Sequence, residues 1–255
     1  MSVVRFDVEG RVAIIRLDRP EARNAVNAEL ATALEEAIDR LESDDTLWLG
    51  ILGHEGPVFC AGADLKEVAA GRAAGLSTER GGFGGIVLRE RTKPLIAAVD
   101  GPAVAGGTEI VLACDLRVAS TRAAFGIPEV KRSLVAAAGG LQRLPRVLPP
   151  AIAMELALTG DTIDAATAHH HGMINEVCEP GRVVERALAL AARIEANAPL
   201  AVRESRRLLL AAPTMTDAEG IREAGRAMAR LAATEDFAEG PRAFIEKRPP
   251  VWTGR

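Results

Sequence analysis

The spacing of hydrophobic residues changes twice within the first fifty positions. Between residues 3 and 17, apolar and polar residues alternate on both sides of Gly10, which predicts a β-hairpin. From Asn27 to Leu41 the apolar residues recur at helical spacing, and Asn is a favoured residue at the start of a helix. A further apolar run at residues 48–52 predicts another strand. The chain therefore opens with two predicted strands, a helix and a third strand.

Strands and helices continue to alternate as far as about residue 180. The predicted elements are a short helix within 59–67, strands at 94–99, 116–119 and 173–177, and a helix at 108–114. This alternation favours an α/β fold with crossover connections. The pattern then becomes almost wholly helical, with predicted helices at 181–197, 199–212, 216–234 and 236–246. We expect an α/β core over residues 1–195 that carries the active site, and a C-terminal helical region over residues 196–255.

One segment of the core lacks a clear period. Residues 68–85 are rich in Ala and in Gly, with glycines at Gly71, Gly75, Gly81, Gly82, Gly84 and Gly85. Long irregular segments in compact domains are often functional, so we expect a mobile segment that acts as a lid beside a site.

The composition narrows the class of protein. The 255 residues include 48% hydrophobic ones, and 31 Lys or Arg against 35 Asp or Glu give a formal net charge of -4. This balance excludes disordered, collagen-like and disulfide-scaffold proteins, and net acidity disfavours a nucleic-acid partner. No apolar run reaches the roughly 18 residues that a membrane-spanning helix needs. The chain has no Tyr, which excludes mechanisms that use a phenol as acid or base.

The cysteines and the first residues suggest a compartment. Cys60, Cys114 and Cys178 are an odd number of widely spaced thiols, as in a reduced, cytosolic protein. The first residues do not resemble a signal peptide. We therefore expect a cytoplasmic protein, and the usage of Arg and Ala suggests a bacterial source.

Glu109 is the first candidate for chemistry. The predicted helix around it is otherwise apolar, and burying a lone carboxylate among apolar residues is costly. Two interpretations remain open from the helix alone. Glu109 is either a functional group with a perturbed pKa or a first-turn residue on an exposed stripe that the helix dipole favours.

Two glycine loops add candidate hydrogen-bond donors. Gly106 and Gly107 come just before the predicted helix, where backbone N–H groups are unpaired and can bind an oxyanion. The loop at residues 59–66 also leads into a short helix, which Asp64 would cap. Together the two loops suggest a bipartite oxyanion hole.

A second carboxylate, Glu129, follows Pro128 at the end of an apolar run. Alone, it is more typical of a solvated turn. With Glu109, however, it supplies a pair in which one carboxyl acts as base and the other as acid.

Six motifs extend in order over essentially the whole chain: LDRPEARNA at residues 17–25, FCAGADLK at 59–66, AGGTE at 105–109, FGIPE at 125–129, GGLQRL at 139–144 and FIEKR at 244–248. This ordered set resembles the motifs of the enoyl-CoA hydratase/isomerase (crotonase) family. Stretches near the C-terminus further resemble carnitinyl-CoA dehydratases. The resemblance implies a spiral of repeated ββα units followed by a helical C-terminal region.

The resemblance also implies roles for the candidates. The N–H groups of Ala63 and Gly106 would bind the thioester oxygen, while Glu109 activates water and Glu129 delivers a proton. The reaction implied is reversible addition of water to a 2-enoyl-CoA by a hydro-lyase of fatty acid β-oxidation type. The alternatives are a carnitinyl-CoA or other 3-hydroxyacyl-CoA dehydratase, a double-bond isomerase, and a non-catalytic acyl-CoA binding protein.

Coenzyme A enters as part of the substrate, with no separate cofactor and no metal. The substrate- and CoA-binding residues implied by the resemblance are Arg23, Ala61, Ala63, Asp64, Leu65, Lys66, Gly106, Phe244 and Lys247. Phe244 and Lys247 would reach the nucleotide, often from a neighbouring subunit, in a homotrimer or a dimer of trimers. Three adjacent histidines, at residues 169–171, cannot all face one metal ion from a helix end, and we expect no metal there. The basic residues after Glu129 and the Ala-rich stretch at 136–138 differ from the commonest hydratase pattern, which leaves the acyl specificity open.

Overall fold

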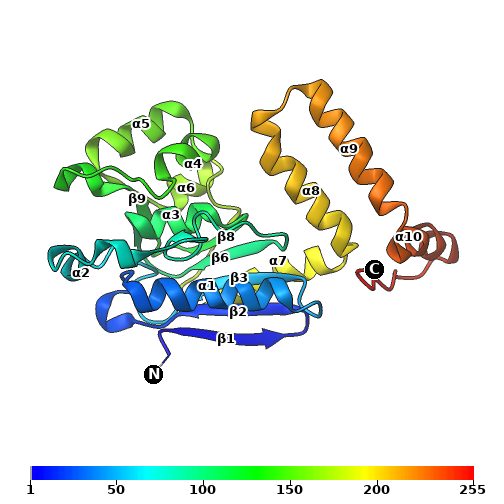
Figure 1. The fold of residues 1–255 in the computed structure, drawn as a ribbon, viewed down its shortest axis with the longest axis horizontal. Helices are drawn as coiled ribbons and strands as arrows, with labels where there is room; N and C mark the ends of the chain where they lie inside the picture. Colours follow the sequence, from blue (N-terminus) through cyan, green and yellow to red (C-terminus); the bar gives the residue numbers. More distant parts are fainter. Residues whose placement is uncertain (1) are drawn as a thin grey trace. The chain divides into compact units, whose positions relative to one another are not determined.

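The predicted hairpin and the strands after it join in one six-stranded sheet (Figure 1). Its order is β1 (Val4–Glu9), β2 (Val12–Leu17), β3 (Leu49–His54), β6 (Leu95–Val99), β8 (Leu116–Ser120) and β11 (Glu176–Cys178). Only the β1–β2 pair is antiparallel, and every later pair is parallel. The computed structural model describes residues 2–255.

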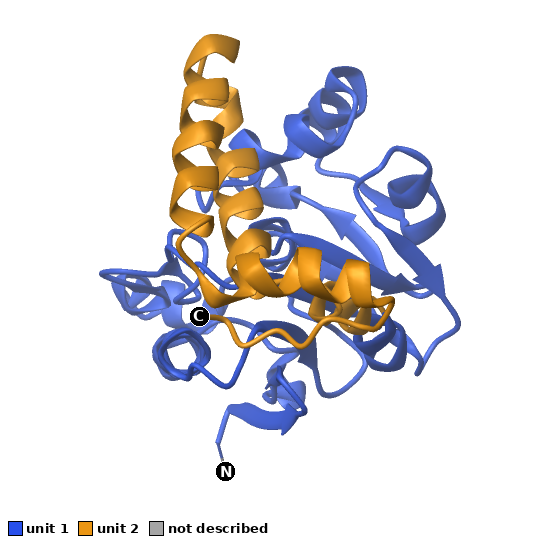
Figure 2. Cartoon of the chain, turned by 90° about the vertical axis from the view of Figure 1, so that its right-hand side faces the viewer, with its two compact units in different colours: residues 1–189 blue, residues 190–255 orange. Residues whose placement is uncertain are grey.

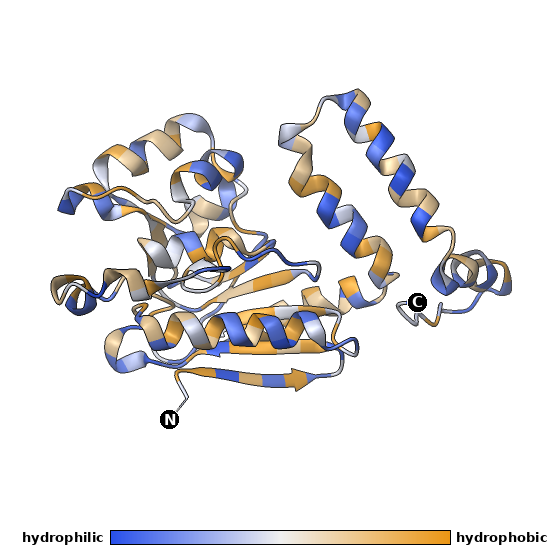
Figure 3. Ribbon diagram, viewed as in Figure 1, coloured by the Kyte–Doolittle hydropathy of each residue, from blue (hydrophilic) through white to orange (hydrophobic). Residues whose placement is uncertain are grey.

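The inner strands are buried along almost their whole length. All of β6 and all but the last residue of β3 are buried, as parallel strands covered on both faces require. Figure 3 shows β6 as an almost continuous hydrophobic ribbon. The edge strand β1 is mostly exposed and alternates apolar with charged residues, and Asp7 on it forms an ion pair with Arg16 of β2. Charged side chains on an edge strand oppose pairing with another chain.

Helices and two smaller sheets complete this part of the molecule. The helices are α1 (Ala28–Ser43), α2 (Leu65–Ala69), α3 (Gly106–Ala113), α4 (Gly140–Val147), α5 (Pro150–Thr159), α6 (Ala165–His170) and α7 (Val183–Glu195), with short 3-10 helices at Pro20–Ala22, Ala73–Leu76 and Pro128–Arg132. The smaller sheets are β10 (Thr162–Asp164), β9 (Ala124–Gly126) and β7 (Ala103–Val104), and the pair β4 (Ser77–Thr78) and β5 (Gly82–Phe83). As predicted, Asn27 caps α1, where its side-chain oxygen accepts the N–H of Leu30.

The chain divides into two compact units, residues 1–189 and 190–255 (Figure 2). The predicted boundary lies a little further along the chain, at the end of α7. The second unit contains α8 (Pro199–Ala211), α9 (Asp217–Leu231), α10 (Glu235–Glu246) and a 3-10 helix at Ala212–Thr214. Thr216 and Glu219 form a capping box at the start of α9, and Arg230 of α9 pairs with Glu204 of α8. Within residues 2–255, none of the helices has the length and apolar character needed to cross a membrane.

One local prediction was wrong. The strand predicted at 173–177 begins only at Glu176, because the chain first makes a turn through Gly172, whose φ is +87°. His54 is the last residue of β3, and its Nε2 accepts the N–H of Asp100 at 3.0 Å. Burial lowers the pKa of His54, so the neutral imidazole that makes this bond is favoured.

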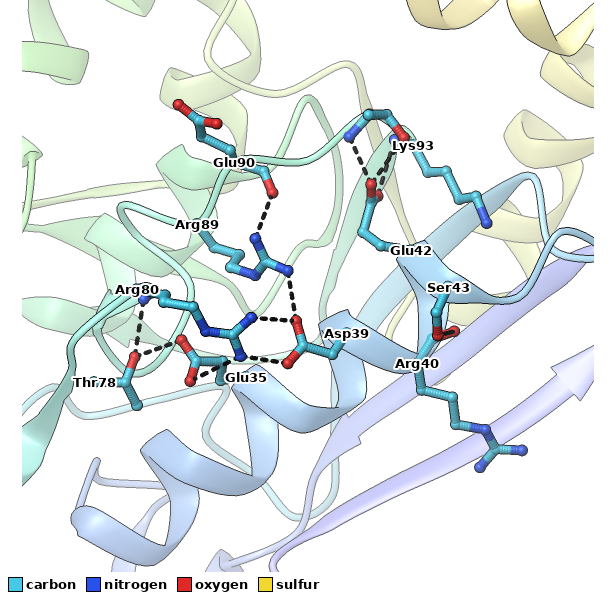
Figure 4. Close-up of polar contacts among 12 residues, drawn as sticks. Glu35, Asp39, Arg40, Glu42, Ser43, Thr78, Arg80, Arg89, Glu90 and Lys93 are labelled. Carbon is cyan, nitrogen blue, oxygen red and sulfur yellow. Dashed lines mark hydrogen bonds and ion pairs between the residues drawn. The ribbon is translucent and has the colours of Figure 1, made fainter.

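The segment expected to be a mobile lid, residues 68–85, divides at residue 76, and its second part continues to residue 93 in one stretch. Residues 68–76 form the end of α2 and a 3-10 helix, whereas the stretch from residue 77 to 93 is fastened to one face of α1 (Figure 4). Asp39 of α1 pairs with both Arg80 and Arg89, and Glu35 accepts a hydrogen bond from the hydroxyl of Thr78. We call these contacts between α1 and residues 77–93 the α1 clasp. They also include Glu42, which accepts the backbone N–H groups of Thr92 and Lys93.

Candidate active site

One cavity of about 1340 Å³ in the first unit brings most of the predicted site residues together. Those on its wall are Arg23, Ala61, Ala63, Asp64, Leu65, Lys66, Gly106, Glu109 and Glu129. The volume exceeds the roughly 300–1,000 Å³ of a typical small-molecule pocket, which leaves room for a large ligand. Phe244 and Lys247 lie in the second unit, where Phe244 is 85% exposed and Lys247 ends α10.

Glu109 is buried in the first turn of α3, with only 3% of its surface exposed. Its Oε1 accepts the backbone N–H of Gly140 at 2.8 Å, a contact between residues 31 positions apart. Because α3 is buried from Gly106 to Leu112, no exposed stripe exists on this helix. The structure thus decides between the two interpretations of Glu109, in favour of a buried carboxyl with a perturbed pKa.

Glu129 lies across the same cavity in the 3-10 helix Pro128–Arg132, and not in a solvated turn. Its Oε2 is buried, and no hydrogen-bond partner for it exists among residues 2–255. A buried polar atom without a partner is costly, and in a cavity it points to a ligand that supplies the partner. Burial also raises the pKa of Glu129.

The two carboxyl groups influence each other's protonation. Burial raises the pKa of Glu109 to about 7, and the negative charge of Glu129 adds to the increase. The N–H of Gly140 opposes it by stabilising the ionised form. Because the charge of Glu129 raises the pKa of Glu109, ionisation of the two groups is coupled.

Two backbone N–H groups meet at the same wall. Those of Ala63 and Gly106 donate to no protein acceptor in the part of the chain that the structure describes, residues 2–255. The loop of Ala63 is held in place by bridges from Val26 to Ala63 and from Cys60 to Ala103. A Cβ on Gly62 would lie 3.0 Å from the backbone nitrogen of Gly106, so glycine lets the two loops approach.

The glycines of α3 are required by close contacts. A Cβ on Gly107 would lie 2.1 Å from the carbonyl oxygen of Cys60. A Cβ on Gly106 would lie 2.3 Å from Cε1 of Phe83, so the Phe83 ring packs directly on the start of the helix. Phe83 was not among the predicted site residues. Its only sequence signal was its place in the glycine-rich segment.

Ala105, just before α3, has a backbone conformation that normally requires glycine. Its φ is +54° and its ψ is -130°, and its own N–H donates to the carbonyl of Gly126 at 2.9 Å. Such a conformation costs about 1–3 kcal/mol for a residue with a Cβ. Ala105 therefore holds this turn with a strained backbone.

The carbonyl end of α3 is held by two buried arginines. Arg117 donates to the carbonyls of Val111, Leu112 and Cys114, and Arg91 donates to that of Ala113. Cations at this end complement the helix dipole, whose positive end is at Gly106. These arginines were not predicted from the sequence, because they contact α3 from neighbouring segments.

Asp64 and the two cations near it differ in their surroundings. Asp64 is buried, caps α2 by accepting the N–H of Lys66, and pairs with Arg19 at 2.7 Å. The hydrogen bond from Arg19 holds the pKa of Asp64 below its usual range. Lys66 and Arg23 are exposed on the cavity wall and, within residues 2–255, have no ion-pair partner. They are therefore free to meet an anionic ligand.

The three histidines at residues 169–171 end α6, where the rings of His170 and His171 stack edge to face. Across residues 2–255 no group of three or more His, Cys, Asp or Glu side chains is placed to hold a metal ion.

Comparison with known proteins identifies the family of this chain. The family model described as enoyl-CoA hydratase/isomerase matches residues 7–255. The chain belongs to the enoyl-CoA hydratase/isomerase family. This confirms the predicted family, and the family's relatives named hydratases and dehydratases confirm the predicted hydro-lyase class of enzyme.

Individual members of the enoyl-CoA hydratase/isomerase family align along nearly the whole chain. The enoyl-CoA hydratase EchA19 of Mycobacterium tuberculosis is 40% identical over 96% of this chain and 94% of its own. The carnitinyl-CoA dehydratase of Salmonella typhimurium is 38% identical over 96% of both chains. A crystal structure of an enoyl-CoA hydratase from M. tuberculosis H37Rv superposes with a TM-score of 0.96 at 46% identity, covering 100% of both chains. The predicted fold class, an α/β crotonase-like fold with a helical C-terminal region, is thereby confirmed.

Proposed function

We propose that this protein reversibly adds water across the 2,3 double bond of a 2-enoyl-CoA thioester. The observation that carries the proposal is that the buried carboxyl group of Glu109 and the half-buried one of Glu129 share one cavity with the free N–H groups of Ala63 and Gly106. Two carboxyls and two oxyanion donors are what conjugate addition of water requires.

The reaction uses each group once. Glu109 as a carboxylate takes a proton from water while the water oxygen bonds to C3. The π electrons move through C2 to the thioester carbonyl, whose oxygen gains negative charge that the N–H groups of Ala63 and Gly106 stabilise. Glu129 as a carboxylic acid then donates its proton to C2. Atoms and charge balance, and the next turnover requires only that the proton on Glu109 return to Glu129.

The pKa values of both carboxyl groups are raised, that of Glu109 to about 7, so either group can carry a proton more readily than a solvated glutamate. We assign water activation to Glu109 because the Gly140 N–H stabilises its ionised form, and proton delivery to Glu129. The same two groups catalyse dehydration of a 3-hydroxyacyl-CoA when the steps are reversed. Relatives named carnitinyl-CoA dehydratase make this the second candidate. An isomerase needs one carboxyl to shuttle a proton, so the presence of both on one cavity favours a hydro-lyase.

The cavity also suits the charge of coenzyme A. Its phosphates would bind the unpaired cations Arg23 and Lys66. Ala61 and Leu65 line the cavity on either side of Ala63, whose N–H would bind the thioester oxygen. We further propose that Phe244 and Lys247 contact the nucleotide of coenzyme A. The protein would form a homotrimer or a dimer of trimers and would act in the cytoplasm.

A panel of thioesters tests the proposal. Crotonyl-CoA, enoyl-CoA thioesters of graded length and crotonobetainyl-CoA would each be followed by the loss of absorbance of the conjugated thioester. We expect hydration of at least one, with 3-hydroxyacyl-CoA as product. Conversion of a 3-enoyl-CoA to a 2-enoyl-CoA without hydration would instead show an isomerase. Tight binding of CoA without turnover of any thioester would show a non-catalytic protein.

The raised pKa of Glu109 predicts opposite effects of pH on activity and stability. Activity should rise with pH around 7, because water activation needs the carboxylate. Stability should fall over the same change, because the folded protein holds this proton more tightly than an unfolded chain with a pKa near 4.5. The contribution is complete below about pH 4.5 and lost as the pH passes about 7, and it amounts to at most about 3 kcal/mol.

Glu109→Gln tests the stability half of that prediction. The neutral amide should make the variant more stable than the wild type at pH 8 and remove the advantage at pH 4.5, as measured by urea unfolding at both values. The matched control is Glu36→Gln on the exposed face of α1. An equal pH response in wild type and Glu109→Gln would contradict the raised pKa.

A further inference from the structure

Arg143, in the first turn of α4, connects two walls of the cavity. Its Nη1 donates to the carbonyl of Ala138 at 3.2 Å, and its Nη2 donates to the carbonyl of Val87 at 2.5 Å. The side chain is half-buried, and a Cβ on Gly139 would lie 2.1 Å from Nη1. The guanidinium therefore lies against the backbone of Gly139, between two segments about fifty residues apart.

The first of these segments is the turn at residues 138–140, which holds Glu109. Gly140 donates its N–H to Oε1 of Glu109, and a Cβ on Gly140 would lie only 3.0 Å from that oxygen. Gly139 has a φ of +100°, so the turn has a conformation that residues with a Cβ rarely adopt. Glycine adopts this conformation without strain, and Arg143 is the side chain that binds the carbonyl of the turn at Ala138.

The second segment is the stretch that the α1 clasp fastens. Val87 lies four residues after Phe83, whose ring packs on Gly106, and two residues before Arg89, which pairs with Asp39 (Figure 4). Through Val87, Arg143 is linked to the wall that packs on the start of α3. One guanidinium thus binds both the turn next to the Glu109 carboxyl group and the segment that packs next to the Gly106 N–H.

We propose that Arg143 is a positioning residue: by spanning the carbonyls of Ala138 and Val87, it holds the turn whose Gly140 N–H orients Glu109 and fixes that turn relative to Gly106. The proposal rests on the proposed function for its catalytic meaning. Its effect on Glu109 itself needs no substrate.

The charges around Arg143 and Glu109 define what its removal changes. Facing Glu109 are Glu129 from the 3-10 helix and Arg143 from α4. Facing Arg143 are Glu109, its helix neighbour Arg146, Arg91 from the clasped stretch and Cys114 at the end of α3. Burial lowers the pKa of Arg143, and its positive charge lowers that of Glu109. Losing Arg143 therefore removes both a charge and the alignment of the Gly140 N–H, and both losses raise the pKa of Glu109.

The first experiment measures Glu109 directly in the full-length protein. Glutamate labelled with ¹³C at the side-chain carboxyl allows an NMR titration, and Glu109→Gln identifies the signal. We expect Arg143→Met to shift the Glu109 midpoint to higher pH. The control is Arg146→Met, on the exposed face of the same helix, which should leave the midpoint unchanged. A midpoint in Arg143→Met equal to that in Arg146→Met would overturn the proposal.

The second experiment separates the charge from the span. Arg143→Lys keeps the charge, but one ammonium group cannot reach both carbonyls as the guanidinium does. We expect kcat for the best thioester to fall up to about 100-fold, as for a misplaced catalytic group, with KM little changed. Full activity in Arg143→Lys would show that charge alone matters and would overturn the positioning role.

A variant that retains Arg143 covers the case in which Arg143→Met does not fold. In Gly139→Ala the added methyl group would lie 2.1 Å from Nη1, so it displaces the guanidinium and should shift the Glu109 midpoint in the same direction. An unchanged midpoint in Gly139→Ala would count against the proposal. If the wild type hydrates no thioester but the Glu109 midpoint still responds, the proposed function fails and the positioning role stands.

Discussion

Replacing Glu129 by Gln is expected to lower kcat/KM for hydration by about 10²- to 10⁴-fold, the usual range for loss of a general acid or base. The amide has nearly the shape of the carboxylic acid but cannot give its proton to C2. Since Oε2 of Glu129 has no protein partner within residues 2–255, the substitution breaks no internal hydrogen bond of that atom. Thermal unfolding should therefore differ little from that of the wild type, and CoA binding measured by calorimetry should be retained.

Glu155→Gln, on the exposed part of α5, is the matched control and should keep full activity. Undiminished hydration by Glu129→Gln would refute the mechanism with two carboxyl groups. Loss of activity together with loss of folding would be recognised from the unfolding curve. Glu129→Asp would then be the test variant, because it keeps the carboxylic acid on a shorter side chain.

The second large effect is expected from Gly107→Ala. The added Cβ would lie 2.1 Å from the carbonyl oxygen of Cys60, and the obstacle is backbone rather than the end of a flexible side chain. Overpacking of this kind typically costs about 1–3 kcal/mol. The loop that must move also carries Ala63, and losing one oxyanion donor costs about 10²- to 10³-fold in kcat. We therefore expect a lower midpoint of urea unfolding together with a loss of kcat in that range.

A glycine elsewhere gives the opposite expectation. Gly225, inside α9, has no atom within 4 Å of an added Cβ, so Gly225→Ala should stabilise the protein by about 0.5–1 kcal/mol and leave kcat unchanged. If Gly107→Ala behaved like Gly225→Ala, the close approach of the two loops would have no functional meaning.

The elements that could be predicted are those that depend on interactions between residues close in sequence. The hairpin around Gly10, the helix capped by Asn27 and the C-terminal helices all lie within a few residues of their predicted positions. Each depends on local periodicity and capping. The late strand was placed three residues too early because its apolar residues begin before the turn through Gly172 has ended. A single apolar run does not show where a turn stops and pairing starts.

The site divides in the same way. Glu109, Glu129 and the two glycine loops stood out because carboxyls in apolar runs and glycines before helices are local features. Their shared cavity, by contrast, depends on contacts between distant segments. Gly140 binds Glu109 from 31 positions away, and the Phe83 ring reaches Gly106 from the clasped segment. Whether Glu109 was buried could be known only once every face of α3 was covered.

The α1 clasp affects the entropy cost of ligand binding in this protein. Ion pairs of Asp39 with Arg80 and Arg89 hold the cavity wall that carries Phe83 against α1 as part of the fold itself (Figure 4). Conformational entropy lost in fixing that wall is then a cost of folding and not of binding. Because these pairs are partly exposed, added salt weakens them, and ionic strength would act on this wall at a distance from the reacting atoms.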